Sequence, residues 1–296
     1  MLPFNNLPDN SKVDWFMQPT TGNELHTWNK PSGCNFIYML AVGGGAFGGN
    51  GFSGAAGTAR GGGGGGSCGQ LCTLIVPAFL VPDSLYIKVG SGGIRSTSTN
   101  GTSTVISAYR TVTGSEIYLT AGGGNNGGNG SGSAPGSGGT TTTPGIPNST
   151  LGTIGKWQGL ITLGGSAAGA IAGAAGVVAT FNYILSGGAG GGSTTSGDFA
   201  GGDITSAYGQ VSALTVVKGG AAVANATSGQ NDGGNGYFIP KRFASYGGAG
   251  GGASNNGVGG NGGKGGPGSG GGGGGAGITG GLGGDGGDGF AVIISY

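Results

Sequence analysis

Charged side chains are scarce in this 296-residue chain: they make up 7% of it, and the net charge at pH 7 is +1. A balance this small offers no electrostatic basis for binding nucleic acid or an anionic membrane, so we expect neither as a partner. The chain also has a single histidine, His26, with no serine, cysteine or carboxylate positioned beside it. No pair of carboxylates suggests glycoside hydrolysis either. We therefore expect that the protein is not an enzyme.

Short sequence matches to catalytic and nucleotide-binding motifs carry no weight in this chain. Residues 65–69 (GGSCG) fit the G-x-S-x-G form of a nucleophile elbow, but a strand-turn-helix setting and a later histidine are missing. The many G-x-G-x-x-G matches have no βαβ unit around them. Lys264 follows a glycine but precedes Gly265 instead of Ser or Thr, which excludes a P-loop. No cofactor is expected.

Cysteine is rare and odd in number, with Cys34, Cys68 and Cys72. Free, mostly buried thiols are the favoured interpretation; one disulfide with a spare thiol is the second. A zinc site made with His26 is the least favoured, because a C-x3-C spacing alone is weak support. Residues 1–30 are polar and interrupted by three prolines, unlike a secretory signal. We expect assembly in a reducing compartment and no metal.

Glycine dominates what is present: 83 glycines and 11 prolines make up about a third of the chain. That content usually marks disorder, yet 35% of the residues are apolar and few are charged. Across residues 259–289 a glycine occupies every third position without exception. Three residues per turn is the period of the polyproline II helix, and glycine on one face lets another backbone approach closely. Collagen is disfavoured, because the tract contains one proline, Pro267.

The long tract predicts packed extended helices. At about 3.1 Å per residue it would span roughly 95 Å if straight, which exceeds a compact domain of this size. We therefore expect it to fold back on itself several times, with backbone amides and carbonyls of adjacent passes bonding laterally.

Short apolar runs predict β-strands between the glycine segments, and no amphipathic helix is evident. Residues 84–89 alternate, with Leu85, Ile87 and Val89 on one face. The fold class expected is all-β, with short strands framing stacked polyproline or polyglycine II helices. The expected strands are 35–42, 71–77, 84–89, 102–106, 116–120, 158–163, 210–218 and 290–296.

The order of these segments resembles the glycine-rich domain of bacteriophage virion proteins, notably tail-fibre and receptor-binding adhesin proteins. The motifs are WNKPSG (28–33), AVGGGAFGGNG (41–51), RGGGGGGSCG (60–69), VPAFLVPDSLYIKVGSGG (76–93), NGTSTVIS (100–107), AGGG (121–124) and GGDGGDGFAVIISY (283–296). Residues 28–124 and 246–296 carry the resemblance. It implies stacked polyglycine II helices framed by β-strands, and localisation in a virion.

The expected domain organisation is a polar leader (1–30), which contacts either another virion protein or subunit or the chain's own core, and a glycine-rich domain (31–296). Residues 140–245 do not match the resembled pattern and are expected to be an insertion. Within them, residues 165–185 are uncharged and long enough to span a membrane, but Ala and Gly fill the first half and no Lys/Arg cluster flanks it. A buried strand with a glycine-rich connector is preferred, so no stable membrane insertion is expected.

Two segments are candidates for partner contacts, because aromatic and Arg side chains commonly anchor interfaces. The first is 237–246, for which packing beneath the glycine layers is the alternative. The second is a polar surface loop, 140–157, that ends in an aromatic residue. The candidate contact residues are Tyr237, Phe238, Lys241, Arg242, Phe243, Tyr246 and Trp157.

The function expected from the resemblance is that of a non-enzymatic virion structural protein: a fibre, spike or adhesin that presents a rigid glycine-rich head for host attachment. Its expected partners are other virion proteins, a host cell-surface receptor and, by analogy with fibres, two further copies in a homotrimer. The alternative is a free-standing polyglycine II protein, either ice-binding or from an extracellular matrix. Mixed side chains at the third positions of the long tract argue against a flat ice-binding face.

Overall fold

The protein is all-β, as the sequence predicted. The computed structural model describes residues 7–8, 10–18, 25–111, 117–132, 134–140, 156–160, 184–205, 216–240 and 243–296. The helical elements whose bounds lie wholly within this part of the chain are two single 3₁₀ turns, η1 (Ala78–Leu80) and η2 (Arg95–Thr97). The strands are β1 (Lys12–Met17), β2 (Leu25–Asn29), β3 (Phe36–Val42), β4 (Leu71–Pro77), β5 (Ser84–Lys88), β6 (Thr104–Ser107), β7 (Ile117–Ala121), β8 (Lys156–Leu160), β9 (Ile204–Thr205), β10 (Val216–Val217), β11 (Phe238–Ile239), β12 (Ala244–Ser245) and β13 (Phe290–Ser295).

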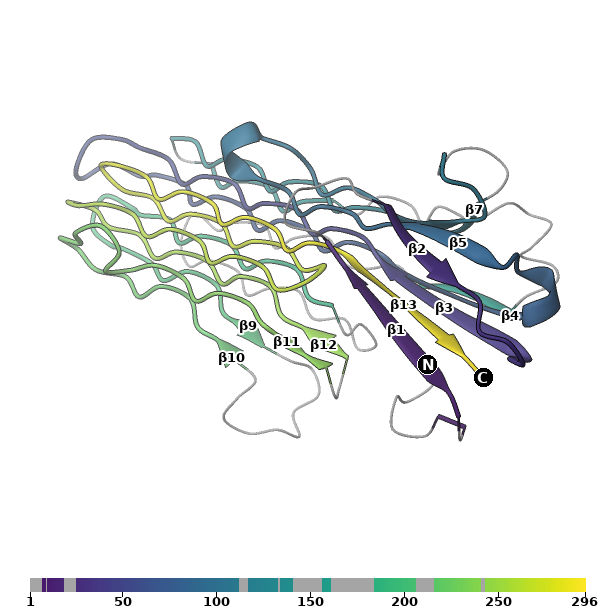
Figure 1. Ribbon diagram of the computed structural model, residues 1–296. Coiled ribbons are helices and arrows are strands. Elements are labelled where there is room, and N and C mark those ends of the chain that lie inside the picture. The colour runs from purple at the N-terminus through teal and green to yellow at the C-terminus, as the bar shows by residue number, and fades with distance from the viewer. Residues whose placement is uncertain are drawn as a thin grey trace.

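The strands form antiparallel sheets, and the two larger sheets lie at one end of the molecule, here called the strand end (Figure 1). A five-stranded sheet has the order β1-β13-β3-β4-β8, and a four-stranded sheet has the order β2-β5-β6-β7. Two strand pairs, β9-β10 and β11-β12, complete the described strands. The first and last strands, β1 and β13, lie side by side, with Lys12 opposite Ser295.

The main hydrophobic core fills the space between the two larger sheets. β3 shows why its sequence is apolar throughout. Its alternate residues Ile37, Met39 and Ala41 face this core, while Tyr38, Leu40 and Val42 face a second cluster on the other side of the sheet. A strand covered on both faces needs no polar alternation. β5 is covered on one face only, and there the alternation of buried Leu85 and Ile87 confirms the expected strand.

The leader contains two strands that the sequence did not predict; the short strands β9, β11 and β12 were not predicted either. β1 and β2 fall within residues 1–30, and both belong to the large sheets. Trp28 is buried, and its indole Nε1 donates a hydrogen bond to the Asp14 carboxylate at 2.9 Å. Trp15 packs against Phe290 of β13. The described part of the leader therefore packs on the chain's own core.

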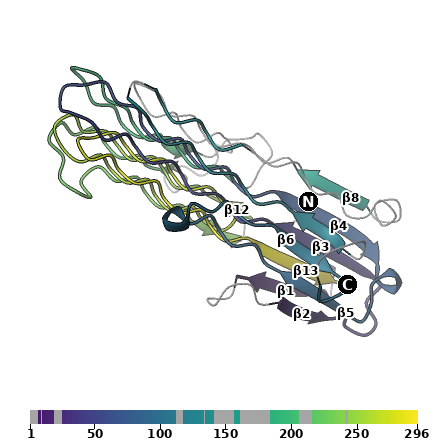
Figure 2. The same cartoon turned by 90° about the horizontal axis from the view of Figure 1, so that it is seen from above.

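The rest of the described chain forms a block of parallel extended segments, here called the glycine array: residues 43–70, 122–140, 184–203, 218–237 and 246–289. Each segment leaves the strand end, runs outward, turns and comes back, as Figures 1 and 2 both show. For example, the chain leaves β3 at Gly43, turns at residues 55–59 and re-enters β4 after Gln70. The far end, where these turns lie, is called the turn end. Described parts of the expected insertion, 184–203 and 218–237, are built into this same array.

Hydrogen bonds within the array follow a period of three. Along residues 268–277, amides three apart donate to one and the same neighbour: Gly271, Gly274 and Gly277 bond to the carbonyls of Ala46, Gly49 and Phe52. The amides of residues 270, 273 and 276 donate to the carbonyls of 185, 188 and 191, in a second neighbouring segment. The amides of 272 and 275 donate to the carbonyls of 263 and 260, in a third. Three residues per turn thus direct the donors toward three different neighbours.

The carbonyls of the same segment point toward three more neighbours. The carbonyls of residues 268, 271 and 274 accept from the amides of 69, 66 and 63. Those of 270, 273 and 276 accept from the amides of 248, 251 and 254. Those of 269, 272 and 275 accept from the amides of 287, 284 and 281. The segment 268–277 is therefore a polyglycine II helix surrounded by six others. Each backbone N–H and C=O of this segment therefore forms a hydrogen bond with another protein group instead of with water.

Glycine is required where these helices touch. A Cβ placed on Gly272 would lie closer than 3.0 Å to the Ala249 carbonyl, and one on Gly274 would overlap the Gly281 carbonyl. Both obstacles are backbone atoms fixed by their own hydrogen bonds. The close spacing of the array therefore depends on the absence of side chains.

The long tract folds back as expected, in three passes. The first pass ends in a turn at residues 266–269, where Ser269 N–H donates to Gly266 O at 2.8 Å. Pro267 occupies the second position of this turn and Gly268, with φ +71°, the third. Proline followed by a glycine of positive φ is the combination that a type II turn favours. The second reversal lies near residues 277–279, and the third pass enters β13.

Asn and Asp side chains take over the hydrogen bonding at the surface of the array. The Oδ1 atoms of Asn50 and Asn261 accept from the amides of Gly283 and Leu282, at 2.9 and 3.0 Å. Asp285 Oδ1 accepts from the Arg95 amide at 2.9 Å, which ties η2 to the array. Surface amides that have no adjacent helix are satisfied in this way.

Candidate functional site

The turn end brings together turns that are far apart in the sequence. Direct contacts join them: Gly57 N–H donates to Asn255 Oδ1 at 3.0 Å, and Gly280 N–H donates to Ser53 Oγ at 2.8 Å. The turns comprise residues 53–59, 131–132, 194–197, 224–230, 255–258 and 277–280. This end lies opposite the strand end, which contains β1 and β13 (Figure 1).

One buried cation fastens the turn end. Arg60 is 1% exposed, although it follows a run of exposed turn residues. Its guanidinium donates from Nε to Ser193 Oγ (3.1 Å) and from Nη1 to Gly54 O (3.2 Å). Its Nη2 donates to both oxygens of Asn255, at 2.7 and 2.6 Å. A planar group with several donors can satisfy three segments at once. Arg60 therefore joins the turns 53–59 and 255–258 to Ser193, the residue that precedes the turn 194–197.

The charge balance around Arg60 involves one acid. Burial lowers the pKa of the Arg60 guanidinium from its ordinary value, and the nearby Asp198 carboxylate opposes that effect. Burial likewise raises the pKa of the Asp198 carboxyl, against the opposing effects of Arg60 and of a hydrogen bond from the Asn255 backbone. Asp198 Oδ1 is buried and has no hydrogen-bond partner among the described residues. The buried Arg60 and the partly exposed Asp198 thus each favour the charged form of the other.

The surface of the turn end is uncharged. None of the turn residues defined above is Asp, Glu, Lys or Arg. Their exposed polar side chains carry hydroxyl or amide groups, and one large apolar side chain, Ile278, is 45% exposed. Leu282, just beyond the last turn, is 44% exposed. Such a surface can contact a partner through hydrogen bonds and apolar packing, and it offers no group that ionises near neutral pH. The exposed polar residues are Ser53, Thr58, Ser131, Thr195, Ser196, Asn225, Thr227, Ser228, Gln230, Asn256 and Thr279.

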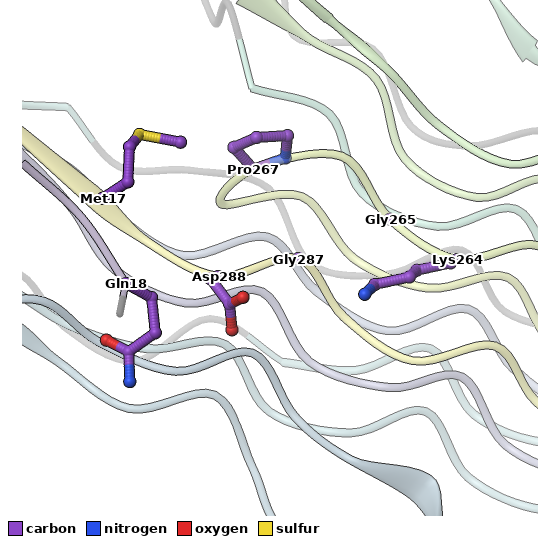
Figure 3. Close-up of a pocket in the computed structure, with 7 residues that line it drawn as sticks. All are labelled: Met17, Gln18, Lys264, Gly265, Pro267, Gly287 and Asp288. Carbon is purple, nitrogen blue, oxygen red and sulfur yellow. The ribbon is translucent and has the colours of Figure 1, made fainter. Parts of the chain in front are cut away.

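A cavity of about 170 Å³ lies where the end of β1 meets the array. Met17, Gln18, Lys264, Gly265, Pro267, Gly287 and Asp288 line it (Figure 3). In Figure 3 the Lys264 side chain extends toward Gly287 and Asp288. Asp288 Oδ1 also accepts a hydrogen bond from Gly92 N–H at 2.8 Å, which fixes the carboxylate. The lining supplies one amine and one carboxylate, and it includes no Ser, Cys or His side chain.

The aromatic segment 237–246 lies at the junction of strands and array. Tyr237 and Tyr246 stack with ring centroids 4.6 Å apart. Phe243 packs edge-on against Phe238, 6.0 Å away, and against Phe290. Phe243 and Tyr246 are only 2% and 3% exposed, so for these two side chains the packing alternative describes the structure.

The other candidate contact residues are half-buried, lie outside the described residues, or are described by their backbone alone. Tyr237 and Phe238 are half-buried. Lys241 and Arg242 lie outside the described residues. Trp157 is in β8, where its backbone pairs opposite Leu74. A contact with a partner through these positions stays a prediction.

The three cysteines form no disulfide: Cys68 and Cys72 are buried, and Cys34 is partly exposed. Burial raises the pKa of the Cys72 thiol to about 12.

Among the described residues no group of three His, Cys, Asp or Glu side chains could hold a metal ion. Within the same residues there is no helix long and apolar enough to cross a membrane. Most of 165–185 falls outside them.

Sequence reasoning missed Arg60 and the gathering of the turns. The only local signal is a lone arginine between a small-residue turn and a glycine run, in the sequence TARGGGGGG.

No protein-family model matches this chain, and no curated protein matches it.

Proposed function

We propose that this chain is a non-enzymatic structural protein of a bacteriophage virion, a fibre, spike or adhesin whose turn end contacts the host surface. The observation that carries the proposal is the separation of the two ends. The first and last strands lie together at one end, and uncharged turns from six parts of the chain are gathered at the other. The order of strands and glycine segments, which resembles virion adhesins, supplies the virion context.

The array supports this role through its rigidity. Backbone hydrogen bonds join each glycine helix to its neighbours, and Arg60 joins two of the turns to the residue that precedes a third. Turns that are already ordered lose less conformational entropy when a partner binds. A platform of this kind presents its surface without a folding step.

The virion role is tested by immunoelectron microscopy of purified particles of the phage that encodes the chain, with antibody against this protein. We expect labelling of mature particles on the tail or another surface projection. Particles that carry no label, from lysates in which the free protein is detected, would contradict the proposal.

The contact role is tested by competition for adsorption. Purified protein is mixed with host cells before phage is added, and we expect it to slow adsorption. Replacing the exposed turn 224–230 with a Gly-Ser segment of equal length should abolish the competition. Phe79→Ser is the matched control, because Phe79 is 83% exposed but lies in η1 at the strand end. Equal competition by both variants would place the contact elsewhere.

A homotrimer is the assembly we propose, by analogy with fibres. Sedimentation equilibrium of the full chain gives its mass directly, and a monomer at micromolar concentration would refute it. Measurement of thermal hysteresis separates the virion role from the ice-binding alternative, since an adhesin has no effect on ice growth.

A further inference from the structure

Asn-Gly pairs are chemically labile, and this chain has seven of them. The labile step is attack of the glycine's backbone nitrogen on the side-chain carbonyl carbon of the asparagine. Glycine favours it, because no Cβ hinders the approach and its backbone reaches conformations that other residues avoid. The nitrogen must be free to approach. The seven asparagines are Asn50, Asn100, Asn126, Asn129, Asn235, Asn256 and Asn261.

In six of the pairs the glycine nitrogen is held by the array. Its N–H donates a hydrogen bond to a carbonyl of a neighbouring segment, so the attack first requires that the bond break and the segment move. The bonds are Gly51 to Gly281 (2.9 Å), Gly101 to Gly124 (3.1 Å), Gly127 to Phe47 (3.0 Å), Gly130 to Asn50 (2.8 Å), Gly236 to Lys264 (2.7 Å) and Gly262 to Leu282 (2.8 Å).

The seventh pair, Asn256-Gly257, lies in a turn at the turn end and differs. The amides of Asn256 and Val258 donate to Ala224 and Ala226, both at 2.9 Å. The Gly257 amide lies between these two bonded amides, in the bend at residues 255–257. Within the part of the chain that the structure describes, it has no hydrogen-bond acceptor. The Asn256 side chain is exposed and, within the same residues, has no hydrogen-bond partner.

We propose that Asn256 is a site of spontaneous deamidation, selected by the fold from seven equivalent sequence pairs. The Gly257 nitrogen forms a bond to Cγ of Asn256, the Cγ–Nδ2 bond breaks, and Nδ2 leaves as ammonia together with the former amide proton. Water then opens the resulting succinimide at either carbonyl and yields aspartate or isoaspartate. No oxidant or enzyme is needed.

The product places one negative charge on an otherwise uncharged surface. An isoaspartate would also add a methylene to the backbone of the turn that follows Asn255, the residue that accepts two hydrogen bonds from Arg60. The modification thus changes both the charge and the geometry of the turn end. The proposal stands whatever the function of that surface is.

Peptide mapping of the folded protein, aged at mildly alkaline pH below its unfolding temperature, tests the proposal. The mass gain from replacing an amide by a carboxyl is followed at each of the seven pairs, with enzymatic methylation to detect isoaspartate. We expect Asn256 to react at least about tenfold faster than any other pair. Tenfold corresponds to about 1.4 kcal/mol, which is comparable to the loss of one protecting hydrogen bond.

Two controls keep the result interpretable. In urea, where the array is absent, all seven pairs should react at similar rates. Asn256→Gln should remove the fast signal from the folded protein and leave the other six rates unchanged. The proposal is overturned if Asn256 reacts no faster than the other pairs in the folded protein. It is also overturned if its advantage persists in urea, because local sequence and not the fold would then be the cause.

Discussion

The close packing of the glycine array predicts a large difference between two chemically identical substitutions. Gly272 lies in the surrounded helix, where an added Cβ would overlap the Ala249 carbonyl. Gly132 lies in an exposed turn, has no positive φ, and its added Cβ would have no atom within 4 Å. Gly272→Ala should therefore be strongly destabilising and Gly132→Ala slightly stabilising.

The magnitude for Gly272→Ala follows from what must move. Displacing the Ala249 carbonyl disturbs the bond that it accepts from Gly263, and shifting residue 272 disturbs its bonds to Gly263 and Gly284, which are 2.9 and 2.8 Å long. Three buried backbone bonds at about 0.5–1.5 kcal/mol each, together with about 1–3 kcal/mol for overpacking, give roughly 2.5–7.5 kcal/mol. A whole domain is stable by about 5–15 kcal/mol, so this loss is a large part of the total.

Gly132→Ala has the opposite sign, because alanine reduces the conformational entropy of the unfolded chain. The expected gain is about 0.4–1 kcal/mol. Urea unfolding followed by tryptophan fluorescence gives the free energy of unfolding of each variant. If both variants lie within about 1 kcal/mol of the unsubstituted protein, the reasoning about backbone contact in the array is refuted.

Three further predictions concern single side chains. Arg60→Met should lower the free energy of unfolding by about 3 kcal/mol or more, because several acceptors lose their donor. Arg95 is half-buried and donates one side-chain bond to a carbonyl, so Arg95→Met should lower it by less than about 1 kcal/mol. Equal losses would refute the conclusion that Arg60 joins the turns. Asn261→Ala should lower the free energy of unfolding by about 1 kcal/mol and speed hydrogen exchange of the Leu282 amide. Asn225 is exposed, and Asn225→Ala should have neither effect. An unchanged exchange rate in Asn261→Ala would contradict the side-chain hydrogen bond. Burial raises the pKa of Cys72 from 9.0 to about 12 and that of Tyr38 from 10.0 to about 12. The unfolded chain therefore loses these protons first, and stability should fall above pH 9 by about 1.4 kcal/mol per pH unit for each group between its two pKa values. Urea titrations between pH 8 and pH 11 should show a shallower decline in Cys72→Ala, and identical slopes would be evidence against the shift.

Much of the fold could be read locally. The apolar runs at 71–77 and 290–296 are strands because branched and aromatic residues fit a buried, pleated surface. The threefold glycine period reappears directly as the threefold hydrogen-bond period. β1 was missed because it lies at the sheet edge with no fully buried residue, and Lys12 and Asp14 interrupt its apolar residues. Among the candidate contacts, Phe243 and Tyr246 have the composition of an interface and the position of a core, which sequence alone does not distinguish.

The candidate surface at the turn end was out of reach of the sequence for a different reason. Its turns are short, polar and unlike one another, and only the alternation of outward and inward passes brings them to one end. Arg60 is one charge in a glycine-rich stretch until Ser193 and Asn255, distant in the sequence, come beside it.

The sequence by itself determined the all-β class, the strands with continuous apolar runs and the three-residue repeat of the array, because each of these follows from properties of neighbouring residues. Only the tertiary structure decided which helix lies against which, in which six Asn-Gly pairs the glycine amide is hydrogen-bonded, and which turns share a surface. The physical reason is that glycines have no side chains by which one segment could be told from another. Their partners are therefore set by topology and backbone hydrogen bonds, and not by any pattern along the chain.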